Sequence, residues 1–243
     1  MSGHSKWSTI KRQKSANDAT RGKIFTKLGS AITIAVKEGG SADREANFRL
    51  RLMMDKARQA NMPRENIDRA IKRASGKTGE SKELHEVLYE GFGPEGIAVL
   101  AEGVTDNKQR TASAVKNIFS AKGGHLAGVG SVVYQFTRVG EIHLGKVKSM
   151  DEMLEQALAA GALDIEEEPD RFIVYVSAAD LAKVRDYFVN QHLSVLESEL
   201  VYRPVNPIKV SDQATATKML EFLSALDELD EIHKIYANYE TTL

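Results

Sequence analysis

The first quarter of the chain repeats apolar residues at helical spacing, which predicts three short helices. They are expected at roughly 18–38, 43–61 and 63–76, with Asn17 or Asp18 as the N-cap of the first. Three helices joined by short connections favour a small bundle.

Glycine and proline punctuate this predicted bundle. Gly39-Gly40 ends the first helix, and Pro63 suits the first turn of the third. Gly29 falls inside the first helix, where a glycine costs about 1 kcal/mol relative to alanine. Close packing against a neighbouring helix is the expected reason for it.

After a polar, Gly-rich segment at 76–83, short apolar runs alternate with helical segments. Strands are expected at 87–89, 97–100, 132–136, 141–144, 163–167, 171–176, 195–202, 208–210 and 232–239. Helices are expected at 106–122, 150–160, 178–191 and 212–227. Val139-Gly140 is expected to separate the strands at 132–136 and 141–144. The order predicts an α+β fold: a three-helix bundle plus two α/β sandwich domains with mainly antiparallel sheets.

The domain order follows from which pieces can fold alone. The strand–helix–strand piece at the end of the chain cannot cover its own sheet, and the strand–strand–helix piece at 84–124 is equally incomplete. We therefore expect them to complete each other. The predicted domains are a basic helical domain at 1–78, a split α/β domain at 79–130 and 205–243, and an inserted α/β domain at 131–204.

Charge divides the chain at the same place. The 243 residues contain 33 Lys plus Arg and 34 Asp plus Glu, for a net charge of −1. Residues 1–78 hold eighteen bases and seven acids, a net charge of +11, and residues 79–243 hold fifteen bases and twenty-seven acids, a net charge of −12. Such an asymmetry suggests a polyanion partner for the first part.

Composition excludes several other classes. The absence of Cys rules out disulfides and thiolate chemistry, and fits a reducing compartment. The N-terminus lacks the apolar core of a signal peptide, and no apolar run approaches the roughly 18 residues of a membrane span. A cytoplasmic protein that does not bind membranes is expected.

Basic residues of the first 78 positions avoid the apolar stripes of the predicted helices, so they can meet phosphates while the stripes pack. Trp7 lies among them and could stack on a base or anchor the segment by packing. Merely solvated basic faces are the alternative. The candidate nucleic-acid-binding residues are Lys6, Trp7, Lys11, Arg12, Lys14, Arg21, Lys23, Lys27, Arg49, Arg51, Lys56, Arg58, Arg69, Lys72 and Arg73.

No catalytic or metal-binding set emerges elsewhere, and no cofactor is expected. Gly76-Lys77-Thr78 matches the end of a phosphate-binding loop motif. The motif also needs a Gly at position 71, which is Ile here, and it needs a helix to begin at Gly76, where one is expected to end. None of the six histidines stands at metal-ligand spacing from another.

Two further polar motifs have structural and functional interpretations. The acidic run Glu166-Glu167-Glu168 with Asp170 could bind a cation, although a solvated turn between strands explains it better. Thr105-Asp106-Asn107, followed by Arg110-Thr111, can cap a helix or form a contact surface.

Spaced motifs along the whole chain resemble those of the YebC family, which includes bacterial transcriptional regulators and the mitochondrial translational activator of cytochrome c oxidase. In the N-terminal part they are Gly3-His4-Ser5-Lys6-Trp7, Ile10-Lys11, Arg21-Gly22-Lys23, Asn61-Met62-Pro63, Asn66-Ile67 and Arg69-Ala70-Ile71-Lys72. Later ones are Tyr89-Glu90-Gly91-Phe92-Gly93-Pro94, Thr105-Asp106-Asn107, Arg110-Thr111, Lys122-Gly123-Gly124, and Gly130-Ser131-Val132 with Tyr134 and Phe136.

The chain departs from the family pattern at a few positions. Gly29-Ser30 stands where the family often has a charged pair, and Met53-Met54 is bulkier than the usual pair. His125 and Ala127 replace the common Asn and Gly of the glycine loop, which weakens what the resemblance implies about that loop.

The resemblance implies a three-domain fold, no enzymatic activity, and DNA-binding transcription regulation in the bacterial cytoplasm, since the chain lacks an Arg-rich mitochondrial leader. The alternative it implies is a ribosome-associated translation factor that binds ribosomal RNA and relieves stalling at proline-rich stretches. The acidic α/β domains could recruit a protein partner. A third hypothesis, a hydrolase with an unrecognised site between the α/β domains, would need a turnover that a pocket substitution abolishes.

Overall fold

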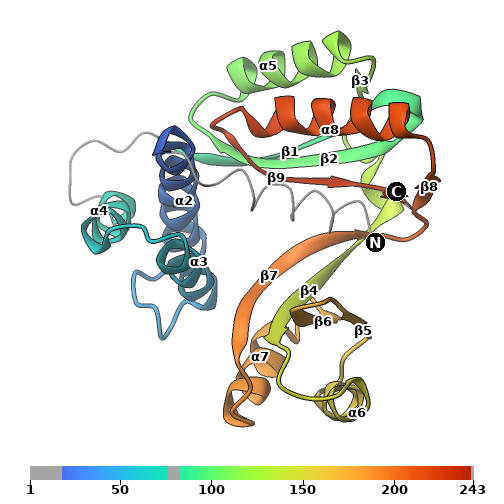
Figure 1. Cartoon of the computed structure of the whole chain (residues 1–243). Coiled ribbons are helices and arrows are strands. Elements are labelled where there is room, and N and C mark those ends of the chain that lie inside the picture. The colour runs from blue at the N-terminus through green and yellow to red at the C-terminus, as the bar shows by residue number, and fades with distance from the viewer. Residues whose placement is uncertain (1–17, 76–82, 242–243) are drawn as a thin grey trace. The chain divides into compact units, whose positions relative to one another are not determined.

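A computed structural model describes residues 18–75 and 83–241. The chain forms two compact units (Figure 1). The first runs up to Phe136 and resumes at Pro204, and the second is the continuous segment Thr137–Arg203. Within the described residues, none of the helices is both long and apolar enough to span a membrane.

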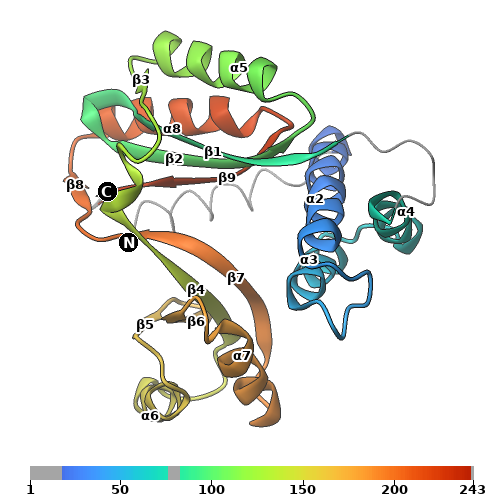
Figure 2. The same cartoon turned by 180° about the vertical axis from the view of Figure 1, so that it is seen from behind.

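Three helices open the first unit. They are α2 (Asp18–Glu38), α3 (Phe48–Gln59) and α4 (Arg64–Ala74). Helix α2 packs against both of the others (Figure 2). Ile32, Leu50 and Ala57 are fully buried between them, and Ile67 and Ala70 bring the apolar face of α4 into the same core. The predicted bundle is confirmed.

The second helix starts later than predicted, at Phe48 instead of Asp43, because Asn47 is its N-cap. The Asn47 side chain accepts a hydrogen bond from Leu50 N at 3.0 Å. Its Nδ2 donates to the carbonyls of Ala35 and Ser41, both at 2.8 Å. A side chain committed to these three bonds holds the preceding residues in a turn, which periodicity alone does not reveal.

Gly29 does not serve the close packing expected for it. Apart from its chain neighbours and the backbone of its own helix, a Cβ at this position would meet no atom of the described chain within 4 Å. The helix therefore carries a glycine that no neighbour requires.

The rest of the first unit is a sheet with two helices on one face (Figure 1). Its four strands follow the order β3-β1-β2-β9, and all three pairings are antiparallel. The elements are β1 (His85–Phe92), η1 (Pro94–Gly96), β2 (Ala98–Thr105), α5 (Lys108–Ala121), β3 (His125–Leu126), η2 (Val133–Gln135), β8 (Ile208–Val210), α8 (Gln213–Asp227), β9 (Ile232–Ala237) and β10 (Tyr239–Thr241). Phe119 of α5 and Phe222 of α8 meet edge to face, with ring centroids 4.9 Å apart. Segments more than 80 residues apart in sequence thus share one core.

A buried carboxylate fixes the loop that leads out of this sheet. Glu90 is 3% exposed, and its two oxygens accept hydrogen bonds from Gly130 N, Val132 N and Val133 N at 2.7–2.8 Å. Burial alone would raise the pKa of Glu90, but these three bonds to the charged form lower it. The segment 130–133 is therefore tied to β1.

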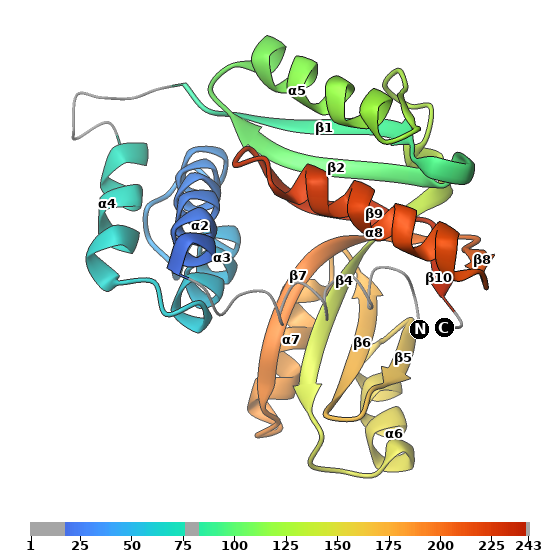
Figure 3. The same cartoon turned by 45° about the horizontal axis from the view of Figure 1, so that its top comes forward.

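The second unit is a four-stranded sheet with α6 and α7 on one face (Figure 3). Its elements are β4 (Phe136–Gly145), α6 (Met150–Ala160), β5 (Asp164–Glu167), β6 (Arg171–Ser177), α7 (Leu181–Asn190) and β7 (Val195–Pro204). The strand order is β5-β6-β4-β7, and β6 pairs antiparallel with both β4 and β5. The element order is therefore strand–helix–strand–strand–helix–strand.

The predicted break at Val139-Gly140 is wrong, because β4 is one continuous strand and 133–135 is a 3-10 turn. Gly140 pairs with Val176 in the middle of the sheet. A Cβ at Gly140 would stand 2.7 Å from Val176 Cγ2 and 2.9 Å from Leu181 Cβ. This glycine admits α7 close to the sheet instead of marking a turn.

The fold class is confirmed: a helical bundle followed by α+β parts with mainly antiparallel sheets. The one parallel pair in the described residues joins β8 and β10. The finer division into 1–78, 79–130 with 205–243, and 131–204 stays a proposal.

Candidate nucleic-acid interface

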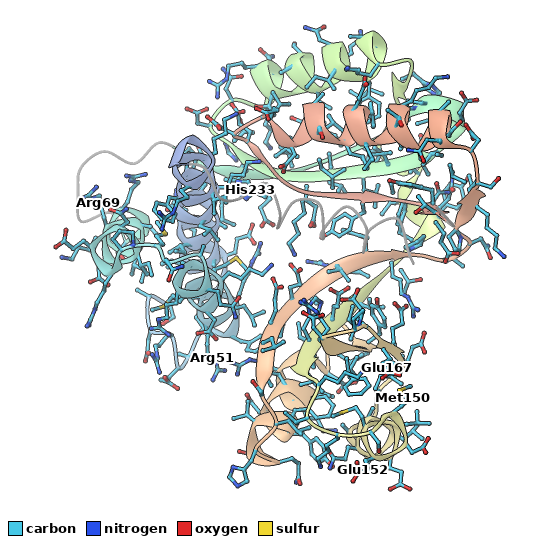
Figure 4. All side chains as sticks on the ribbon, in the orientation of Figure 1. Arg51, Arg69, Met150, Glu152, Glu167 and His233 are labelled. Carbon is cyan, nitrogen blue, oxygen red and sulfur yellow. The ribbon has the colours of Figure 1, made fainter. Side chains whose placement is uncertain are left out.

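Helix α4 presents a face of exposed bases. Arg69, Lys72 and Arg73 are exposed, and their i, i+3, i+4 spacing puts them on one face, opposite buried Ile67 and Ala70. Arg69 lies on the outer side of α4 in Figure 4. In the described part of the chain, no acidic side chain forms an ion pair with any of the three.

The lysines of α2 have a different environment, at the C-terminal end of α8. Lys23 Nζ lies 2.6 Å from Glu228 Oε2 and 3.4 Å from the Glu228 carbonyl. Lys27 Nζ donates to the Asp227 carbonyl at 2.6 Å and to Asp227 Oδ1 at 3.3 Å. The hydrogen bond to Glu228 raises the pKa of Lys23. Both cations are committed to a contact within the first unit.

The position of these lysines has a physical reason. The last carbonyls of a helix lack intrahelical partners, and the helix dipole makes that end negative. Acidic residues there are unfavourable, yet α8 ends in Asp227 and Glu228. Lys23 and Lys27 supply both the missing donors and the opposite charge. They therefore join the bundle to the end of α8.

The bases of α3 also have neighbours within the chain. Arg49 forms ion pairs with Glu38 and with Glu86 of β1. The Arg51 guanidinium lies 5.4 Å from the centroid of the Phe48 ring, and Arg58 lies 3.3 Å from Asp55. Figure 4 labels Arg51 on α3. Within the described residues, Arg49, Arg51 and Arg58 therefore already have contacts with charged or aromatic side chains, unlike the three bases of α4.

The remaining predicted residues divide in two. Arg21 and Lys56 lie on α2 and α3, exposed and half-buried respectively, and each has an interaction within the chain. Lys6, Trp7, Lys11, Arg12 and Lys14 lie outside the described residues. Their predicted role stays a prediction.

The acidic run of the second unit is paired side chain by side chain. Glu166 and Asp164 contact Arg203 at 2.8 and 2.7 Å, and Glu167 contacts Lys146 at 2.7 Å. Glu168 and Asp170 both contact Arg171. Among residues 18–75 and 83–241, no group of three His, Asp or Glu side chains is arranged to bind a metal ion.

The Thr105–Thr111 motif is a helix cap. Asn107 Oδ1 accepts from Arg110 N at 3.0 Å, and Thr105 Oγ1 accepts from Asn107 N at 2.9 Å. Arg110 in turn contacts Asp106 and Glu231, at 2.6 and 2.9 Å. The capping interpretation is confirmed.

This arrangement defines a class of protein in which a basic helical bundle is joined to a two-part α+β region. A family model described as "TACO1/YebC protein N-terminal domain" matches residues 5–77, and one described as "TACO1/YebC second and third domain" matches residues 84–239. The chain belongs to the TACO1/YebC family, as its motifs predicted.

Two relatives that match over nearly their whole length are named as probable transcriptional regulators. A protein of Finegoldia magna named "Probable transcriptional regulatory protein" is 44% identical, over 99% of both chains. One of Acidithiobacillus ferrooxidans with the same name is 47% identical, over 99% of this chain and 95% of that one. The crystal structure of a conserved hypothetical protein from Aquifex aeolicus matches with a TM-score of 0.85 and 37% identity, over 93% of each chain.

Sequence reasoning missed the acidic end of α8 as the partner of the α2 lysines. A signal was present, because Asp227-Glu228 and Asp230-Glu231 follow a helical pattern at the end where acids are unfavourable. It could suggest that cations come from elsewhere in the chain. It could not say from which helix.

Proposed function

We propose that this protein is a non-enzymatic, DNA-binding transcriptional regulator that contacts phosphates through the exposed basic face of α4. The observation that carries this is the convergence of Arg69, Lys72 and Arg73 on one rigid helix face, without acidic partners in the described residues. Such cations displace counterions from phosphates. The names of the full-length relatives support regulation of transcription as the purpose.

The other predicted nucleic-acid-binding residues have different roles in this proposal. Lys23, Lys27 and Arg49 act mainly in joining the bundle to the α/β part. The segment with Lys6, Trp7, Lys11, Arg12 and Lys14 stays a predicted second contact. Action in the cytoplasm, and recruitment of a protein partner by the acidic parts, also belong to the proposal.

The test substitutes the α4 face in the full chain. The variant Arg69→Ala/Lys72→Ala/Arg73→Ala should bind a DNA duplex more weakly at every salt concentration. The slope of log affinity against log salt should fall by about 2–3 units, roughly one for each lost phosphate contact. Fluorescence anisotropy measures both quantities.

A matched control is Lys108→Ala/Lys116→Ala/Lys218→Ala, three exposed lysines on α5 and α8. It has the same change in net charge and should keep the wild-type salt slope. Equal losses in the two triple variants would show that only net charge matters and would contradict the α4 proposal. A preference for a promoter duplex over a random duplex would support regulation through DNA.

The alternative, binding to ribosomal RNA, predicts co-sedimentation with ribosomes and no preference between the two duplexes.

A further inference from the structure

Large apolar side chains are exposed in one short stretch of the second unit. Val147, Leu154, Leu158 and Leu163 are 68%, 39%, 65% and 65% exposed. Scattered apolar residues are ordinary on a protein surface, but a cluster of them marks an interaction site. Three of these four belong to α6 or follow it directly.

On α6, Met150, Leu154 and Leu158 are spaced four residues apart and so form one line along the helix. Buried Met153 and Ala157 hold the neighbouring side of α6 against the sheet. Figure 4 shows Met150 on the side of α6 nearer to Glu167 of β5, and Glu152 on the outer side.

Leu163 immediately precedes β5. Ile165 pairs with Val174, which is fully buried, and side chains two residues apart in a strand share a face. The helix-covered face is identified by Gly140 and Val176, which lie against Leu181 of α7. Leu163 therefore lies on the face that α6 covers. Met150, Leu154, Leu158 and Leu163 are called the α6 stripe below.

Acidic residues border this stripe. Asp151 and Glu155 each follow a stripe residue by one position, which puts both on its solvent side, and both are exposed. The unit Thr137–Arg203 carries seven Lys plus Arg against thirteen Asp plus Glu. The potential around the stripe is therefore negative, and it favours a cationic partner.

A second copy of this chain is the wrong occupant on the same ground. Two α6 helices packed through their stripes would bring Asp151 and Glu155 of both copies together, and like charges across an interface are unfavourable. A line of apolar residues at i, i+4 and i+8 fits the ridge of another helix.

We propose that the α6 stripe is a docking surface for an amphipathic helix of a partner protein, whose apolar ridge is bordered by Lys or Arg. The stripe takes the apolar ridge, and Asp151 and Glu155 meet the cations. This surface is independent of the basic face of α4, so either proposal can fail while the other stands.

The probe is a labelled synthetic helix of about 18 residues with a leucine ridge bordered by lysines, together with its twin in which glutamates replace the lysines. Each is titrated into the full chain and followed by fluorescence anisotropy. The affinity of the chain for the lysine peptide should be at least about tenfold higher than its affinity for the glutamate peptide. Asp151→Asn/Glu155→Gln should narrow that difference.

The decisive variant is Leu154→Ser/Leu158→Ser, which should weaken the lysine peptide about tenfold or more because the apolar contact is lost. Its matched control is Val189→Ser, an exposed apolar residue of α7, which should leave binding unchanged. Both sites are exposed, so unchanged thermal melting confirms that the variants fold.

Three results would overturn the proposal. The leucine variant could bind the lysine peptide as the wild type does, or the two peptides could bind equally well. Alternatively, sedimentation equilibrium could show a wild-type dimer that Leu154→Ser/Leu158→Ser converts to a monomer. The last result would make a second copy the occupant.

Discussion

At the scale of single residues, two buried ionisable side chains have specific partners within the fold. Glu90 holds the loop 130–133 through three backbone N–H groups. His143 of β4 is 4% exposed, and its Nε2 lies 2.6 Å from Glu141 Oε1. Each sits where an ionised group is stable only with its partners in place.

Replacing Glu90 by Gln should destabilise the protein by about 2–3 kcal/mol, because an amide cannot accept all three bonds as an anion does. Since the pKa of Glu90 is lowered, the wild-type contribution is present above the ordinary value of 4.5. It is lost as pH falls through the folded value below that. Urea unfolding against pH measures this, with exposed Glu221→Gln as a near-neutral control.

His143 should give the opposite pH dependence. Burial alone lowers its pKa, but the hydrogen bond to Glu141 and the charges of Glu197 and Glu199 raise it above 6.5. Its stabilising contribution is therefore full below pH 6.5 and lost as pH rises through the folded value. The urea midpoint should therefore fall as the pH rises above 6.5, and it should fall less in His143→Asn. Equal falls in both proteins would contradict this role.

At the scale of elements, packing decides where strands continue and helices begin. The glycine in β4 looks like a turn signal in the sequence, but it lies in the middle of a paired strand, under α7. The glycine in α2 looks like a packing signal, but it has open space around it. Glycine is therefore required by packing in β4, whereas in α2 it only lowers the stability of the helix.

Gly140→Ala and Gly29→Ala should change stability in opposite directions. The first puts a Cβ within 2.9 Å of Leu181 Cβ and should destabilise by about 1–3 kcal/mol. The second adds a methyl group in open space within a helix and should stabilise by about 1 kcal/mol. Thermal melting of the two variants checks both signs, and a destabilised Gly29→Ala would show an unrecognised constraint on α2.

At the scale of the first unit, the contact between α2 and the end of α8 joins the bundle to the α/β part. Lys27 and Asp227 are the more buried pair, with side chains 11% and 24% exposed. The pair at Lys23 and Glu228 is open to solvent, at 44% and 71%. Most of the stabilising effect is therefore expected from Lys27.

Lys27→Met should destabilise the full chain by about 1–3 kcal/mol, because it removes the ammonium group that donates to both the carboxylate and the carbonyl of Asp227. Adding Asp227→Asn should recover part of the loss, as a double-mutant cycle measures. DNA affinity should stay close to the wild type, unlike that of the α4 triple variant. A large loss of affinity with unchanged stability would instead place Lys27 at the phosphates.

The sequence by itself determined those features of this protein that depend on residues close together in the chain. Helical spacing located the bundle, α6 was predicted at its observed limits, the charge split separated basic from acidic parts, and spaced motifs identified the family. The starts of α3 and β4 were missed, since Asn47 and Gly140 act through residues distant in sequence. The tertiary structure alone decided which bases remain available. Lys23 and Arg69 look alike in sequence, but one meets the end of α8 and the other faces outward, because ion pairing depends on proximity in space.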